Sequence, residues 1–361
     1  PAIKRIYGLY GVPENVENVH LDYGHNYNQA SREAMYRFMG KRLIGGQWDN
    51  YTEPAYTKPA DEVLRVFPGD NPPEGYLSGD ALVEMLLKQA QERRAVHLPK
   101  DNETAAQWRE QHGKAFSRLL GAETPAVDSL DPIRYGMEET ATYVLEHWVI
   151  GRTGAGDKIP ALFYRNNAPV KQDAVILVHG SGKAFFADIE AGSPNTLVTS
   201  LLDKGKAVLL IDAFLTGEHH EPGQTRKPSN IEQFHDTFHP TDTGFRVQDI
   251  LTAYAFLMAR YDMTGVVDLI GVEQAGMWSI LAGAVEPGFR RITADMNQFD
   301  FANDNAWEET CYIPGIRALG DVPAALAAGN TERFVLYNAM PNKEIKALGV
   351  VCTADNRIPE L

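Results

Sequence analysis

The order of apolar and polar positions predicts alternating strands and helices along most of the chain. Short apolar runs bounded by turn residues are typical of buried strands, and stretches with one apolar face are typical of helices. Strands are expected at 143–150, 159–164, 174–179, 206–212, 266–271, 290–295, 333–338 and 347–353, and helices at 80–95, 103–120, 194–204, 242–261 and 275–286. This alternation predicts an α/β fold with a mostly parallel sheet covered by helices.

The first 45 residues have a pattern of their own. Residues 2–10 have helical spacing, 16–22 have the pattern of a strand, and 24–28 form a polar turn that contains His25. Ser31 is expected to cap an amphipathic helix that runs to Leu43. Helix, strand, Gly-His loop and helix resemble the end of an α/β-hydrolase domain.

Turn-forming residues separate this segment from the later α/β region. Residues 46–73 are rich in Pro, Gly, Tyr and Asp and are predicted to form an ordered linker. We therefore expect three parts: the end of an upstream hydrolase domain at 1–45, a linker and helical segment at 46–136, and a hydrolase-like domain at 137–361.

Composition and charge limit the classes of partner. The 361 residues are 44% hydrophobic and 23% charged, as in soluble globular proteins. Lys and Arg number 34 against 48 Asp and Glu, which gives a net charge of -14. This charge argues against nucleic acid or an anionic membrane as the main partner, and a neutral substrate such as a carbohydrate ester fits better. Cys311 and Cys352 are too few for a disulfide framework; one disulfide or two buried free thiols are both compatible with the sequence.

A hydrolase site is suggested at two points of the later domain. The apolar run from Val175 ends at His179-Gly-Ser-Gly182, where Gly180, Ser181 and Gly182 are expected to form an oxyanion loop. The strand-turn-helix that should present a nucleophile reads Asp268-Leu-Ile-Gly-Val-Glu-Gln-Ala-Gly276. Glu273 stands where a serine hydrolase has its serine.

The histidine of a triad is missing from this domain as well. The last histidine of the chain is His239, and residues 352–356 read Cys-Thr-Ala-Asp-Asn after the final expected strand. Two missing members predict that 137–361 is a degenerate hydrolase domain and that its Gly180–Gly182 loop is a remnant. Glu273 is then explained by the helix dipole, and a glutamate nucleophile that forms an anhydride is the alternative. Ser279 is expected to pack inside a helix, and His179 to stabilise its loop.

Four histidines between 219 and 239 allow a further alternative. His219, His220, His235 and His239 lie near several carboxylates, and both side-chain types bind zinc. Pro222, Gly223 and Pro228 interrupt the segment, however, and it has no His-Glu-x-x-His helix. A polar surface loop without metal is therefore favoured, and a metal-dependent hydrolase is kept as the third hypothesis.

Residues 22–28, Asp-Tyr-Gly-His-Asn-Tyr-Asn, with Ser-Arg-Glu-Ala-Met-Tyr at 31–36, resemble the C-terminal end of bacterial acetyl xylan esterase-like α/β-hydrolases. Some members of that family are tandem proteins with a second, weaker hydrolase-like domain, and the resemblance covers nearly the whole chain. It implies that His25 is the general base of a Ser-His-Asp triad. It also implies a carbohydrate ester as substrate, no cofactor, and a secreted or periplasmic location.

Together these features predict hydrolysis of a carboxylic ester, of acetylated xylan or a related carbohydrate, through a serine acyl-enzyme. His25 would act with a serine and an acid from an upstream segment or a companion polypeptide. The alternative of another class is a non-catalytic pseudohydrolase that serves in binding or assembly.

Overall fold

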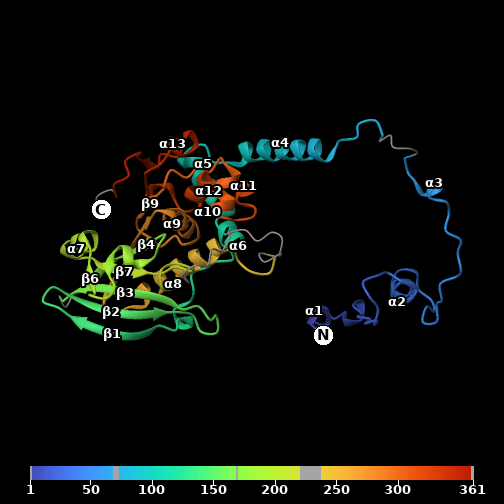
Figure 1. The fold of residues 1–361 in the computed structure, drawn as a ribbon, viewed down its shortest axis with the longest axis horizontal. Coiled ribbons are helices and arrows are strands. Elements are labelled where there is room, and N and C mark those ends of the chain that lie inside the picture. Colours follow the sequence, from blue (N-terminus) through green and yellow to red (C-terminus); the bar gives the residue numbers. More distant parts are fainter. Residues whose placement is uncertain (1, 68–72, 168–169, 220–236, 359–361) are drawn as a thin grey trace. The chain divides into compact units, whose positions relative to one another are not determined.

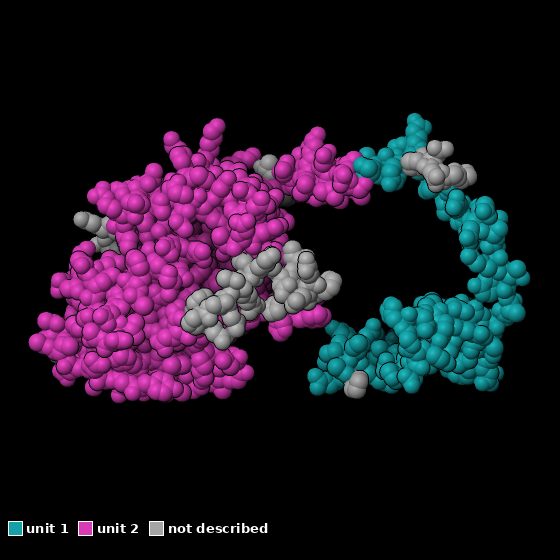
Figure 2. All heavy atoms as spheres, in the orientation of Figure 1, with its two compact units in different colours: residues 1–78 teal, residues 79–361 magenta. Residues whose placement is uncertain are grey.

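The computed structural model describes residues 2–67, 73–167, 170–219 and 237–358 (Figure 1). The chain divides into two compact units, Pro1–Ser78 and Gly79–Leu361, which Figure 2 shows in teal and magenta. The three parts expected from the sequence, 1–45, 46–136 and 137–361, were defined by resemblance to hydrolase domains and not by compactness. That division stays a prediction.

Unit 1 is a series of short helices with almost no interior. They are α1 (Ala2–Leu9), η1 (Pro13–Asn15), α2 (Gln29–Met39), η2 (Gly40–Ile44) and α3 (Asp61–Leu64). Gly40 is the one buried residue among those described in this unit. Helix α2 begins after Asn28, whose Oδ1 accepts the Ser31 N–H at 3.0 Å, so the cap predicted at Ser31 is wrong by three residues. Asparagine is as good a cap as serine.

The strand predicted at 16–22 is not formed. These residues pair with no strand in the part of the chain that the structure describes. A strand exists only through hydrogen bonds to a neighbour, which a local sequence pattern does not supply. Of the helix, strand and helix expected for residues 1–45, only the two helices are present, and the segment between them is unpaired.

Unit 2 is built on one nine-stranded sheet in the order β1-β2-β3-β7-β4-β8-β9-β10-β11. The strands are β1 (Ile133–Glu139), β2 (Tyr143–Ile150), β3 (Ile159–Asn166), β4 (Gln172–His179), β7 (Ala207–Ile211), β8 (Met263–Val272), β9 (Ile292–Asp295), β10 (Phe334–Tyr337) and β11 (Val351–Cys352). The first three are antiparallel to their neighbours and the other six are parallel. The predicted mostly parallel sheet is confirmed. Strands β5 (Ala187–Asp188) and β6 (Ser193–Pro194) form a separate pair.

Helices cover both faces of this sheet. The helices of this unit are α4 (Gly79–His97), α5 (Asn102–His112), α6 (Ala115–Leu120), α7 (Thr196–Asp203), α8 (Asp242–Ala259), α9 (Gln274–Val285), α10 (Asp304–Thr310), α11 (Ile316–Leu319), α12 (Asp321–Ala328) and α13 (Lys343–Ala347), with 3-10 turns η3 (Val127–Ser129), η4 (Lys183–Phe185), η5 (Gly217–His219) and η8 (Thr331–Arg333). Helix α4 is exposed along most of its length and does not cover the sheet. The single helix predicted at 103–120 is two helices that meet at Gly113. No helix among the described residues is both long and apolar enough to cross a membrane.

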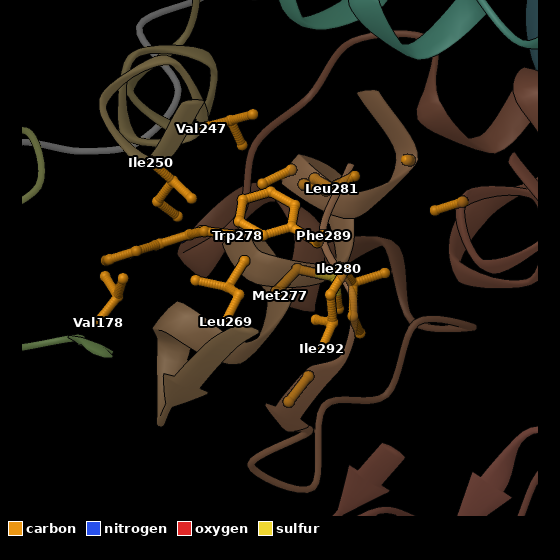
Figure 3. Close-up of a cluster of buried hydrophobic side chains, with 14 of the residues drawn as sticks. Val178, Val247, Ile250, Leu269, Met277, Trp278, Ile280, Leu281, Phe289 and Ile292 are labelled. Atoms are coloured by element: carbon orange, nitrogen blue, oxygen red, sulfur yellow. The ribbon is translucent and has the colours of Figure 1, made fainter. Parts of the chain in front are cut away.

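The central strands are apolar throughout because both of their faces are buried. Ile176 and Val178 of β4 pack with α8 and α9, whereas Val175 and Leu177 pack with α7 on the other face. Figure 3 shows Trp278 of α9 in the first of these clusters.

One buried ionic network ties the antiparallel strands to the end of α8. Glu146 of β2 is 1% exposed and accepts hydrogen bonds from Arg165 and Arg260, at 3.2 and 2.9 Å, and from the Trp148 indole at 2.8 Å. The Arg260 guanidinium also lies 4.3 Å from the centre of the Phe163 ring. Burial by itself raises the pKa of Glu146, but the hydrogen bonds and charge of Arg260 outweigh it and lower this pKa below its ordinary value.

Replacing Glu146 with Gln removes the buried anion that Arg165 and Arg260 share and leaves Asp262 as their neighbouring carboxylate, so we expect the free energy of unfolding at pH 7 to fall by about 2 kcal/mol. Because the pKa of Glu146 is lower in the folded state, its contribution is complete above its unfolded-state pKa and is lost as pH falls through the folded-state value. The difference between the two proteins should therefore shrink on acidification.

Urea unfolding at pH 7 and in steps down to pH 3 measures both effects. Glu332→Gln, at an exposed glutamate of the same unit, is the matched control and should change stability by less than about 0.5 kcal/mol. An equally stable E146Q protein would show that the network contributes nothing.

Candidate functional site

The turn between β8 and α9 has the strained backbone of a nucleophile turn. Glu273 occupies it with φ 54° and ψ -131°, a region that residues other than glycine rarely adopt. Its side chain is 52% exposed, and its N–H donates to Asp295 Oδ2 at 3.0 Å. The strand, turn and helix predicted around Glu273 are all present.

Close packing fixes this turn from both sides. A Cβ on Gly276 would lie 1.7 Å from the carbonyl oxygen of Asp295, at the end of β9. A Cβ on Gly271 would lie 2.2 Å from the carbonyl oxygen of Ala275. Only glycine fits at either position, which lets α9 begin directly against the sheet. No role was assigned to Gly276 from the sequence. Its position three residues after Glu273, in the first turn of the expected helix, was the available signal.

Glu273 is the N-cap of α9, but its side chain makes no capping hydrogen bond. The Glu273 carboxylate therefore interacts with the dipole of α9 only through the long-range attraction of its charge, because it accepts no hydrogen bond from an N–H of the first turn. By helix geometry the N–H groups of Gln274 and Ala275 lack partners within α9.

The predicted oxyanion loop follows β4 directly and faces the same turn. The ideal Cβ position of Gly180 lies 3.2 Å from Glu273 Oε2 and 3.5 Å from the Gln274 nitrogen. Ser181 is exposed, and its N–H donates to His179 Nδ1 at 2.9 Å. Gly182 has φ 94°, and a side chain there would collide with Gly217. The structure thus brings Gly180, Ser181 and Glu273 into one region.

His179 is held tightly at the base of this loop. It is 3% exposed and stacks on Phe185, with ring centres 3.9 Å apart. Burial lowers its pKa, opposed by the charges of Glu273 and Asp295. Its Nε2 lies 3.7 Å from Glu273 Oε2 and has no hydrogen-bond partner in the structure. The expected loop-stabilising role agrees with its Nδ1 contact.

A buried ion pair supports the loop from below and was missed in the sequence. Lys183 and Asp212 are 3% and 0% exposed, and Lys183 Nζ lies 2.5 Å from Asp212 Oδ2. Asp212 Oδ1 also accepts the Lys183 N–H at 2.7 Å, and Lys183 Nζ reaches Glu218. An aspartate at the end of a fully apolar strand was the available signal, because a charge there needs a partner.

The ends of β9, β10 and β11 provide no histidine. Asp295 accepts hydrogen bonds from the Asn297 N–H at 2.7 Å and the Asn338 amide at 2.9 Å. The N–H of Asn338 donates to the carbonyl of Asp355, two residues after Thr353 beyond β11. Asp295 is engaged in holding these loops and is not free to orient a base.

The other nucleophile candidates of unit 2 have structural roles. Ser279 is fully buried, and its hydroxyl donates to the Ala275 carbonyl at 2.8 Å. Cys311 and Cys352 are both free thiols; Cys311 is buried, whereas Cys352 is exposed. Burial raises the pKa of Cys311 to about 12, so it is protonated at neutral pH.

His25 lies in unit 1, on an exposed turn that the Asn26 amide closes by donating to the Gly24 carbonyl at 2.8 Å. Most of the histidine-rich segment 219–239 falls outside the described residues. Among those described, no three His, Cys, Asp or Glu side chains are grouped to hold a metal ion.

Neither a family model nor a curated protein matches this chain in sequence. Solved structures do match it in fold. A candidate acetyl xylan esterase from Bacteroides fragilis covers 77% of this chain and 82% of its own, with 12% identity and a TM-score of 0.58. A methylesterase covers 74% of this chain and 62% of its own, with 13% identity and a TM-score of 0.50. With its parallel sheet, strained turn and glycine loop, the chain has an α/β-hydrolase fold, and the sheet lies within residues 79–361.

Proposed function

We propose that this chain takes part in the hydrolysis of carboxylic esters, with acetylated xylan or a related carbohydrate as the substrate. His25 acts as the general base of a composite site, and an upstream segment or a companion polypeptide supplies the serine and the acid. Residues 137–361 form a non-catalytic module. Two structural neighbours are described as esterases, which supports the reaction class.

The surface around His25 is the observation that carries this proposal. The adjacent Tyr23 and Tyr27 are 61% and 58% exposed. Helix α1 exposes apolar side chains at helical spacing, namely Ile3, Ile6 and Tyr7, and the exposed Tyr10 follows the end of the helix. Contiguous apolar surface of this kind marks protein interfaces. A partner that buries Tyr23 and Tyr27 would also meet His25.

The chemistry needs one proton carrier from this chain. His25 takes the proton as the partner's serine oxygen attacks the ester carbonyl, and then gives it to the departing sugar hydroxyl. Water next attacks the acyl-enzyme with the same base, which releases the acid and restores the serine. No metal or organic cofactor has a part in these steps.

A second candidate function is a pseudohydrolase that only binds or assembles. The strained turn with Glu273 in place of serine favours it, as does the histidine-free sequence after His239. The two functions make different predictions for His25.

In material purified from its native source, we expect His25→Ala to lower the rate of acetyl ester hydrolysis by about 10²–10⁴-fold, the usual contribution of a general base. A fluorophosphonate should label a serine outside these 361 residues. His20→Ala, at a second exposed histidine of unit 1, is the matched control and should hydrolyse at the original rate. An unchanged rate of ester hydrolysis in H25A would contradict the hypothesis of a composite site.

Glu273→Ser tests whether unit 2 lacks a base. The serine would sit on a turn of the right geometry, but His179 holds its acceptor nitrogen against the Ser181 N–H. We therefore expect the variant chain alone to hydrolyse p-nitrophenyl acetate no faster than the original chain and to resist fluorophosphonate. Labelling at position 273 would instead identify His179 as a working base.

A further inference from the structure

His179 presents a buried hydrogen-bond donor that none of the described residues satisfies. Its Nδ1 accepts the Ser181 N–H, so the proton of the neutral ring is on Nε2. Nε2 is buried without a hydrogen-bond partner. Leaving such a group unsatisfied is costly, and in native structures it often indicates a missing ligand or water.

Glu273 presents the complementary acceptor. Its Oε2 lies 3.7 Å from His179 Nε2, beyond hydrogen-bond distance, and the half-exposed Glu273 side chain can turn aside to admit one small group that contacts both. The residue is held in a strained conformation, and such strain persists where the surroundings or a function require it. The neighbouring carboxylate, Asp295, is already bound by the N–H groups of Glu273 and Asn297.

The two groups together select one kind of ligand atom. It must accept from the His179 N–H and donate to the Glu273 carboxylate, which a hydroxyl group does. An ester carbonyl only accepts, so it would meet the carboxylate without a hydrogen bond. We propose that unit 2 binds a neutral, unacetylated carbohydrate through a hydroxyl that bridges His179 and Glu273, and that it disfavours the acetyl ester.

A cavity beside Glu273 provides room for part of such a ligand. Its volume is about 120 Å³, and its lining combines the apolar side chains of Met277, Met296 and Phe299 with Glu273 and Asn297; His179 lies outside it. Sugar rings have this combination of C–H faces and hydroxyl groups. The carboxylates of Glu273 and Asp295 disfavour an anionic sugar acid. A module with this preference would bind the deacetylated part of a polysaccharide, which is the product of ester hydrolysis, and not the part that still carries acetyl esters.

The inference depends on the proposed function only for the choice of xylan-type sugars as probes. Calorimetric titration of the full chain with xylotetraose should give saturable binding. Acetylated xylotetraose and a glucuronic acid-substituted xylo-oligosaccharide should bind at least about tenfold more weakly. Neither His25 nor a partner enters this test, so its failure and the failure of the composite site are separate results.

Two variants locate the binding. Glu273→Gln removes the charge at an exposed position without changing size, and Phe299→Ala removes part of the apolar lining; each should raise the Kd for xylotetraose about tenfold or more. Glu332→Gln should bind like the original chain. Thermal melting of each variant checks folding.

Three outcomes would overturn the proposal. They are no saturable binding of xylotetraose, binding that E273Q leaves unchanged, and tighter binding of the acetylated or acidic sugar. The last outcome would mean that a carbonyl or carboxylate, and not a hydroxyl, occupies the site.

Discussion

The close approach of helix α9 to the end of strand β9 determines the geometry of the candidate site. Gly276 has no side chain because the Asp295 carbonyl occupies that space, and the Asp295 carboxylate binds the N–H of Glu273. The unusual backbone of Glu273 is therefore imposed by its neighbours and does not depend on which side chain it carries. The same packing explains how the strained turn persists with a glutamate at its tip.

The central part of the fold was predictable because its strands are buried on both faces. Runs such as 174–179 are apolar for that reason alone. Strand β1 was missed, since six of its seven residues are exposed and carry no such pattern. The strand at 16–22 was predicted and is not formed, because pairing depends on a neighbour that no local pattern reveals. The apolar spacing of residues 103–120 predicted a single helix, but the structure has two, α5 and α6, with Gly113 between them.

At the candidate site, the sequence located individual residues but did not predict the hydrogen bonds and ion pairs between them. Glu273 was placed correctly by the strand-turn-helix pattern, as was the glycine loop after His179. The contact between Asn338 and Asp295 and the Lys183–Asp212 pair join segments far apart in sequence. The bond from the Ser181 N–H to His179 Nδ1 is local, but it depends on the loop conformation that this packing supports. These contacts decide whether a histidine can act as a base or only as a donor. The glutamate at position 273 was therefore readable in the sequence, whereas the hydrogen-bonding states of His179 and Asp295 were not.

The uncovered apolar side chains of unit 1 also bear on the colloidal behaviour of the isolated chain. Surfaces that expose Ile3, Tyr7 and Tyr10 attract one another in water, while a net charge of -14 keeps molecules apart. The repulsion acts over a screening length of about 10 Å at 0.1 M salt but only about 3 Å at 1 M. Apolar attraction is not weakened by that screening and is strengthened by salts such as sulfate. The solubility of this protein is consequently governed by ionic strength, with dilute buffers favouring dispersed molecules and concentrated salt favouring self-association through the N-terminal unit.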